Sequence, residues 1–282
     1  MEPVALVLVL SSAFFHAAWN AMLKRHPNPE VGVVSVIAVS LVGGAVWALG
    51  LHGPAFASSR GVAWTLAAGV FETVYLASLA RALRHAPLGI AYTVSRGGAM
   101  LWVWPVSVLW LGEAVSVWTV SGAVTIGLGL LLMHLARPTG PVGRGVAWAA
   151  VAAVCIASYH LSYKLALGEG TQPPALFTLS MCVALPMLVA ERVHRLGWRV
   201  FRQEALERPV RVVSAGLVCT LSFAFMLMAL ARTGAGAVMT LRNTSIAFAL
   251  GLAALQGERL GRRQLAGAGL VAAGTVLLGW PG

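Results

Sequence analysis

Three charged side chains stand near the middle of long apolar runs: Glu72, Arg96 and Arg242. A charge at the centre of a membrane span costs about 2.5–3.5 kcal/mol, so such residues face a partner or a ligand. A guanidinium presents a planar fork of donors that suits a carboxylate or a phosphate. We therefore predict that Arg96 and Arg242 hold one anionic group. Glu72 could carry a coupling proton, because burial favours the neutral form of a carboxyl group.

A second interpretation of these charges is structural. Glu72 could pair with Arg96 in an internal salt bridge that only orders the helices. That pair would leave Arg242 without an acidic partner inside the membrane. A ligand role for at least one of the two arginines is therefore favoured.

A second polar group combines histidine, asparagine and aromatic side chains from two apolar runs. Its members are His16, Trp19, Asn20, Tyr159, His160 and Tyr163. Residues four apart share one helix face, and a few placed polar groups among aromatics suit a small-solute site. The alternative is that the aromatic residues form a belt at the membrane interface, where Lys24 and Lys164 extend toward the headgroups.

Catalytic and metal-binding patterns are missing from the sequence. His16 and His160 could in principle share a metal, but no acidic ligand is placed beside them. There is no HExxH, no acidic metal pair and no Ser/His/Asp or Cys/His set, and the cysteines at 155, 182 and 219 show no CxxC spacing. We predict no metal, no cofactor and no enzymatic activity.

The composition says what surrounds these side chains. Of the 282 residues, 59% are hydrophobic and only 10% are charged, and the mean hydropathy is +0.82. Soluble domains carry about 25% charged residues, so most of this chain must be solvated by a lipid bilayer. The net charge of +11 comes mainly from basic residues between apolar runs, which favours topology signals and lipid headgroups over nucleic acid.

Ten apolar runs are each about long enough to span a membrane. They cover roughly residues 3–23, 31–51, 61–83, 86–109, 115–135, 145–166, 174–191, 211–231, 234–255 and 263–280. The arginine-rich linker 192–210 predicts a short interfacial helix. Glycines recur in the fifth and tenth runs, where small residues let helix backbones approach closely in lipid.

The two halves of the chain resemble each other. Residues 16–24 align with 156–164 at an offset of 140, and Ala82-Leu83 aligns with Ala229-Leu230 at an offset of 147. Leu111-Gly112-Glu113 aligns with Gln256-Gly257-Glu258, and we expect both glutamates to cap the helix that follows. We predict two five-helix repeats, 1–136 and 137–282. Because five is odd, the second repeat enters the membrane inverted, a plan of secondary transporters with the substrate site at the repeat interface.

Lysine and arginine concentrate in the linkers that follow odd-numbered runs. The positive-inside rule then places both termini outside the cell.

The chain resembles the EamA-like family of the drug/metabolite transporter superfamily. The resemblance rests on the five-plus-five layout, on Ala82-Leu83 with Pro87 and Pro105, and on the two Gly-Glu pairs, although the second half lacks a counterpart of Pro105. Residues 16–20 also look like a motif of a subgroup associated with phosphonate utilisation. The resemblance implies a bacterial inner-membrane carrier of metabolites, often an exporter, that works by alternating access without ATP. It also implies cytoplasmic termini, against the charge count.

The function predicted is secondary transport, by an exporter or exchanger, of a small organic metabolite that is most simply an anion. Arg96 and Arg242 would hold the anionic group, and Glu72 would be a proton carrier. Two rivals stay open: an intramembrane enzyme and a membrane scaffold that transports nothing.

Overall fold

The computed structural model describes residues 3–111, 115–135, 141–232, 238 and 241–278. Every regular element in these ranges is a helix. The helices are α1 (Pro3–Lys24), α2 (Pro29–Ala48), α3 (Ser59–His85), α4 (Leu88–Leu111), α5 (Val117–Leu135), α6 (Pro141–Gly168), α7 (Pro173–Leu196), α8 (Trp198–Ala205), α9 (Pro209–Leu230), α11 (Ser245–Leu255) and α12 (Arg262–Leu278). Six of them are long and apolar enough to cross a membrane: α1, α2, α3, α6, α7 and α9.

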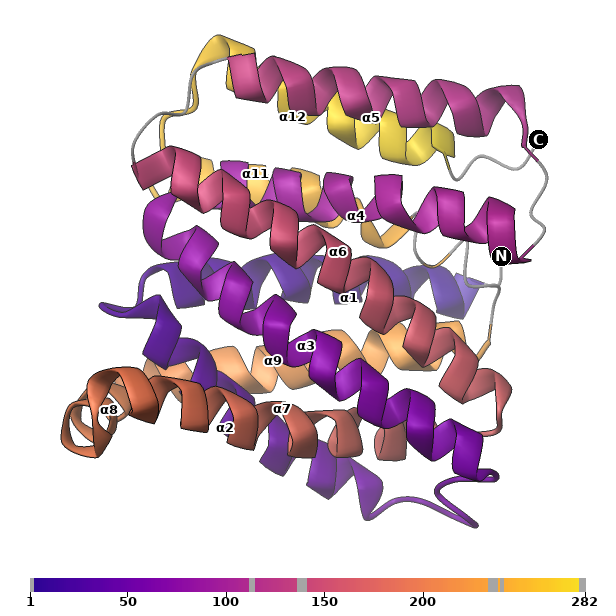
Figure 1. The fold of residues 1–282 in the computed structure, drawn as a ribbon, viewed down its shortest axis with the longest axis vertical. Helices are drawn as coiled ribbons and strands as arrows, with labels where there is room; N and C mark the ends of the chain where they lie inside the picture. The colour runs from indigo at the N-terminus through magenta and orange to yellow at the C-terminus, as the bar shows by residue number, and fades with distance from the viewer. Residues whose placement is uncertain (1–2, 112–114, 136–140, 233–237, 239–240, 279–282) are drawn as a thin grey trace.

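The long helices lie side by side in stacked layers (Figure 1). α5 and α12 form one edge of the stack, and α2, α7 and α9 lie toward the other. α1 begins and α12 ends on the right of the view, whereas the short helix α8 lies on the left. The helix predicted within 192–210 is therefore present, at the opposite end of the bundle from the start of α1.

The ninth apolar run departs from the prediction of one continuous span. Residues 234–237 and 239–240 of this run lie outside the described residues, and α11 covers only Ser245–Leu255. Just before α11, the Thr244 amide donates to the Leu241 carbonyl at 3.0 Å and the Ile246 amide donates to Asn243 at 2.9 Å, both three residues back. The helix is thus tightened and interrupted at Asn243 and Thr244. Polar side chains that compete for backbone groups favour such a break.

Two charged side chains, Lys24 and Glu258, cap the ends of helices to which they do not belong. The Lys24 ammonium donates to the carbonyls of Leu83 at 2.5 Å and Ala86 at 2.7 Å, at the C-terminal end of α3. The Glu258 carboxylate accepts from the amides of Leu88 at 2.8 Å and Gly89 at 3.3 Å, at the start of α4. Glu258 is a cap as predicted, but for a helix of the first half rather than for α12. Glu113 lies outside the described residues.

The predicted close packing through glycine occurs between α5 and α12. A Cβ added at Gly274 would lie 2.7 Å from the Ile126 amide nitrogen, and one at Gly129 would lie 2.6 Å from the Gly267 carbonyl oxygen. A Cβ at Gly127 would meet nothing within 4 Å. Gly129 and Gly274 therefore allow the partner helix to approach closely, whereas Gly127 faces open space.

We expect Gly274→Ala to destabilise the protein by about 1–3 kcal/mol, because the new methyl group meets backbone that cannot move independently. Gly127→Ala is the matched control, since alanine in open space favours a helix by ~0.5–1 kcal/mol. Thermal unfolding in detergent measures both. Equal unfolding midpoints for the two variants would contradict the packing assignment.

Candidate functional site

The Arg242 guanidinium is buried next to the break before α11 and is held by two imidazoles. One terminal nitrogen donates to His160 Nε2 at 2.9 Å, and the other donates to His16 Nδ1 at 3.1 Å. His160 Nδ1 in turn donates to the Ile156 carbonyl oxygen at 2.8 Å. Each imidazole therefore presents an unprotonated nitrogen to Arg242 and is neutral. α1, α6 and the ninth run meet at this guanidinium.

Aromatic side chains surround His16 and His160. The Trp19 indole N–H points to His16 Nδ1 at 3.4 Å, and the Tyr75 hydroxyl lies 3.4 Å from His16 Nε2. The Tyr159 ring stacks on His160 with 4.2 Å between centroids. Trp19, Tyr159 and Tyr163 are fully buried, so the alternative of a lipid-facing belt is wrong for all three. Lys164 is exposed, and Lys24 caps α3.

Glu72 is fully buried and is held by Tyr163 rather than by an arginine. The Tyr163 hydroxyl donates to Glu72 Oε1 at 2.5 Å and lies 3.3 Å from the Ser180 hydroxyl. Within the described residues, no ion pair joins Glu72 to Arg96. The structural alternative of a Glu72–Arg96 salt bridge is therefore wrong.

Arg96 lies against aromatic rings on α4. Its guanidinium carbon is 5.9 Å from the centre of the Tyr92 ring, and the side chain is buried. The Arg242 guanidinium carbon is 5.5 Å from the centre of the Phe223 ring, and the His16 ring lies 6.0 Å from both the Tyr92 and the Phe223 rings. The two guanidiniums thus share one aromatic surrounding, although no hydrogen bond joins them in the described part of the chain.

Several buried polar atoms in this region have no hydrogen-bond partner among the described residues. They are Asn20 Oδ1, Glu72 Oε2, Tyr92 Oη, Arg96 Nη2, Tyr159 Oη, Arg242 Nε and Asn243 Nδ2. Folded proteins satisfy almost all buried polar groups, and each exception calls for an explanation such as a ligand. The unpaired atoms include both hydrogen-bond donors and acceptors.

The structure thus brings together most of the predicted site residues. His16, His160 and Arg242 are in direct contact, Trp19 and Tyr159 pack on the imidazoles, and Asn20 donates to the His16 carbonyl oxygen at 2.7 Å. Glu72 and Tyr163 form a neighbouring pair, and Arg96 stands apart from the hydrogen-bonded group. Sequence reasoning missed Tyr75, Tyr92 and Asn243, although the run Arg242-Asn243-Thr244-Ser245 was a readable sign of a broken helix.

A metal site between the two histidines does not fit this geometry. The nitrogens that would bind a metal already accept from the Arg242 guanidinium, whose positive charge would repel a cation. Among the described residues, no group of three or more potential ligands gathers around a common point.

Long apolar helices around a buried polar cluster define a multi-pass membrane protein. Residues 143–280 match the EamA-like transporter family, so the second half of the chain is similar to that family. The predicted resemblance is thereby confirmed, and membrane transport is the general function.

A solved structure titled "Crystal structure of protein" shares the fold, with a TM-score of 0.64 and 15% identity over 98% of this chain and 96% of that one. No curated protein matches the chain.

Proposed function

We propose that the chain is a secondary transporter, an exporter or exchanger, that moves a small organic anion by alternating access. The observation that carries the proposal is the pair of buried guanidiniums, Arg96 and Arg242. Neither belongs to an ion pair within the described residues, and the nearby carboxylate of Glu72 is engaged by Tyr163. Uncompensated charge is costly in a membrane interior, so an anionic ligand is the natural partner.

The packing of the helices supports two inverted repeats, 1–136 and 137–282, with five spans each. α1 packs against α9 as α6 packs against α3, and α2 packs against α9 as α7 packs against α3. α2 with α7, and α5 with α12, pair with their own counterparts. These reciprocal contacts are what a twofold relation between the halves would produce.

Both proposed repeats contribute to the binding site. Arg242 comes from the second half and Arg96 from the first, and they would hold the anionic group of the solute. His16 and His160 accept from Arg242 and so fix the direction of its guanidinium. Asn20 and Tyr159 offer unpaired oxygens for the rest of the solute, while Trp19 and Tyr163 position His16 and Glu72. Transporters of inverted repeats bind at such an interface, beside discontinuous helices.

For the membrane, we propose the cell inner membrane, with the arginine-rich end of the bundle in the cytoplasm. α8 and its basic linker lie at the end opposite to the start of α1, so both termini would be outside (Figure 1).

Counterflow in proteoliposomes tests the function. Vesicles loaded with one unlabelled solute receive trace labelled solute, across a panel of amino acids, carboxylates, phosphonates and their neutral amides or esters. We expect exchange of at least one anionic solute and none of its neutral analogue, because only the anion compensates the guanidiniums. Exchange restricted to neutral or cationic solutes would contradict an anion carrier. Solute conversion without exchange would indicate an enzyme.

A further inference from the structure

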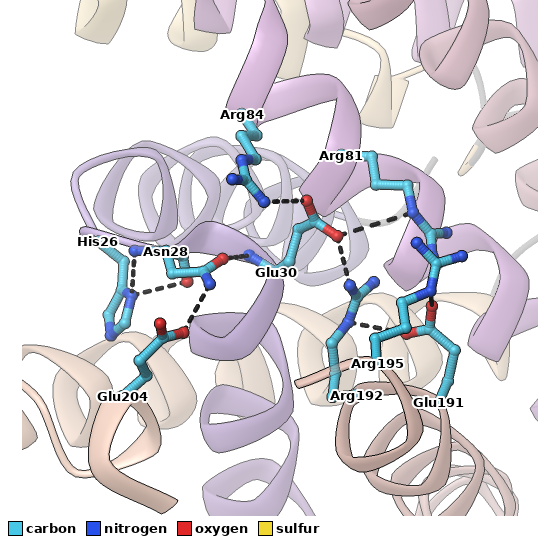
Figure 2. Close-up of polar contacts among 9 residues, drawn as sticks. All are labelled: His26, Asn28, Glu30, Arg81, Arg84, Glu191, Arg192, Arg195 and Glu204. Carbon is cyan, nitrogen blue, oxygen red and sulfur yellow. Dashed lines mark hydrogen bonds and ion pairs between the residues drawn. The ribbon is translucent and has the colours of Figure 1, made fainter. Parts of the chain in front are cut away.

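All six ion pairs in the described part of the chain gather at one end of the bundle. Glu30, in the first turn of α2, lies at the centre of the cluster (Figure 2). Its carboxylate accepts from Arg84 of α3 at 2.8 Å and from Arg192 of α7, and it lies 3.7 Å from Arg81 of α3.

A second carboxylate, Glu191 of α7, completes the cluster. It pairs with Arg81 at 2.5 Å, with Arg192 at 2.8 Å and with Arg195 at 2.7 Å. The Arg81 guanidinium also lies over the Trp148 ring of α6, with 4.7 Å to the ring centre. The cluster, here called the clasp, therefore ties α2 and α3 of the first half to α6 and α7 of the second.

The clasp contains fewer carboxylates than guanidiniums, so its stability depends on each glutamate. Two glutamates hold four arginines, so the group carries two excess positive charges. The side chains of Glu30 and Arg192 are only 8% and 3% exposed, and that of Arg81 is 10% exposed, so water and salt screen their charges weakly. Loss of Glu30 would leave Arg81, Arg84 and Arg192 to repel one another, and in the described residues Glu191 pairs with Arg81 and Arg192 but not with Arg84.

Among the described residues, the other end of the bundle has no counterpart of the clasp. α7 begins at Pro173 as α2 begins at Pro29, so Pro174 stands where Glu30 does, and the repeat offset of 147 places Met228 and Ala231 at the positions of Arg81 and Arg84. The contacts there involve neutral donors: Gln172 donates to the carbonyls of His52 at 3.2 Å and Pro54 at 3.0 Å, and Ser58 donates to Glu169 at 2.9 Å. In the described part of the chain, ion pairs therefore join the helices at the clasp end of the bundle and not at the opposite end.

We propose that the clasp is a gate: it holds the two halves together at the arginine-rich end, and Glu30 must release its arginines before that end can open. The inference rests on the proposed function, because rocking of one half against the other separates α2 and α3 from α7. Ion pairs between rigid elements offer two discrete arrangements, made and broken, as gating of packed helices requires.

A buried cysteine behind the clasp reports the opening without any substrate. Ala77 is buried one helical turn before Arg81 on α3. In protein whose cysteines 155, 182 and 219 are replaced by alanine, Ala77→Cys is labelled in nanodiscs with a membrane-impermeant maleimide. We expect Glu30→Gln to speed labelling about tenfold or more, since it removes the charge that the buried arginines share. The Arg84 side chain is half-exposed and its ion pair with Glu30 is therefore weaker, so Arg84→Gln should speed labelling by less than about fivefold.

Two controls separate a gate from general loosening. Glu169→Gln removes the same charge at the opposite end and should leave labelling of Ala77→Cys unchanged. A second reporter, Ala166→Cys, is buried near the C-terminal end of α6, and Glu30→Gln should not speed its labelling. Unchanged labelling of Ala77→Cys in Glu30→Gln, or equal acceleration at both reporters, would overturn the gate. If the clasp opens as expected while the counterflow panel finds no solute, the gate stands and the proposed function fails.

Discussion

Arg242→Lys should lower transport of the anionic solute by about a hundredfold to ten-thousandfold at low solute concentration. The guanidinium donates to His160 and to His16 through different nitrogens, which a single ammonium cannot reproduce. Losing two hydrogen bonds to a charged group costs about 1.5–3 kcal/mol each, and every ~1.4 kcal/mol is a factor of ten. Because the charge is kept, a large loss would show that the direction of the guanidinium matters.

Counterflow in proteoliposomes measures this effect, with Arg232→Lys as the matched control. Arg232 is exposed, and within the described residues its side chain donates only to the Met228 carbonyl, at 3.2 Å, so the control should transport like the wild type. Both variants must elute as single species in detergent before reconstitution. Transport by Arg242→Lys within about threefold of the control, well under the ~1.4 kcal/mol of a tenfold change, would rule out the anion-holding role.

The helices could be predicted from the sequence because their signal is local. Runs of about twenty apolar residues, separated by proline and charge, correspond to α1 through α7, α9 and α12 within a few residues. The ninth run was the exception. Its average hydropathy hides three successive polar residues, Asn243, Thr244 and Ser245, which interrupt the helix where it is buried in protein.

Partners across the fold could not be predicted in the same way. The sequence places Glu72 in the middle of an apolar run, but the choice between Arg96 and Tyr163 as its partner depends on how α3 packs against α6. Glu30 and Arg192 are 162 residues apart and sit at helix ends, where charges usually serve as topology signals. Their role in joining the halves becomes visible only when α2, α3 and α7 are placed together.

The predicted repeat alignment does not foresee the contacts among the candidate site residues. The alignment pairs Asn20 with His160 and leaves His16 opposite Ile156, yet His16 and His160 converge on one guanidinium. The two halves therefore contribute unlike residues to a common centre. An asymmetric site of this kind can bind an asymmetric solute, which a strict twofold arrangement would bind in two opposite orientations.

Glu72→Gln should abolish accumulation of the solute driven by a pH gradient while leaving exchange of solute for solute intact. The carboxyl group lies among neutral hydrogen-bonding partners, and its Oε2 atom has none in the described residues, so it can gain and lose a proton without breaking an ion pair. Glutamine keeps the shape and still accepts from the Tyr163 hydroxyl, but it cannot titrate. The variant therefore separates proton coupling from binding.

The expected size follows from the driving force. One proton moved per solute across one pH unit supplies about 1.4 kcal/mol, which is a tenfold accumulation. Wild-type proteoliposomes with an imposed gradient should approach that ratio, and Glu72→Gln should stop at equal concentrations on both sides. Glu207→Gln, at an exposed position after α8, is the control for the loss of a carboxylate. If Glu72→Gln accumulates the solute as the control does, the proton travels by another route. If neither the wild type nor Glu72→Gln accumulates the solute but both exchange it, the transporter is an exchanger and Glu72 serves to hold Tyr163 in place.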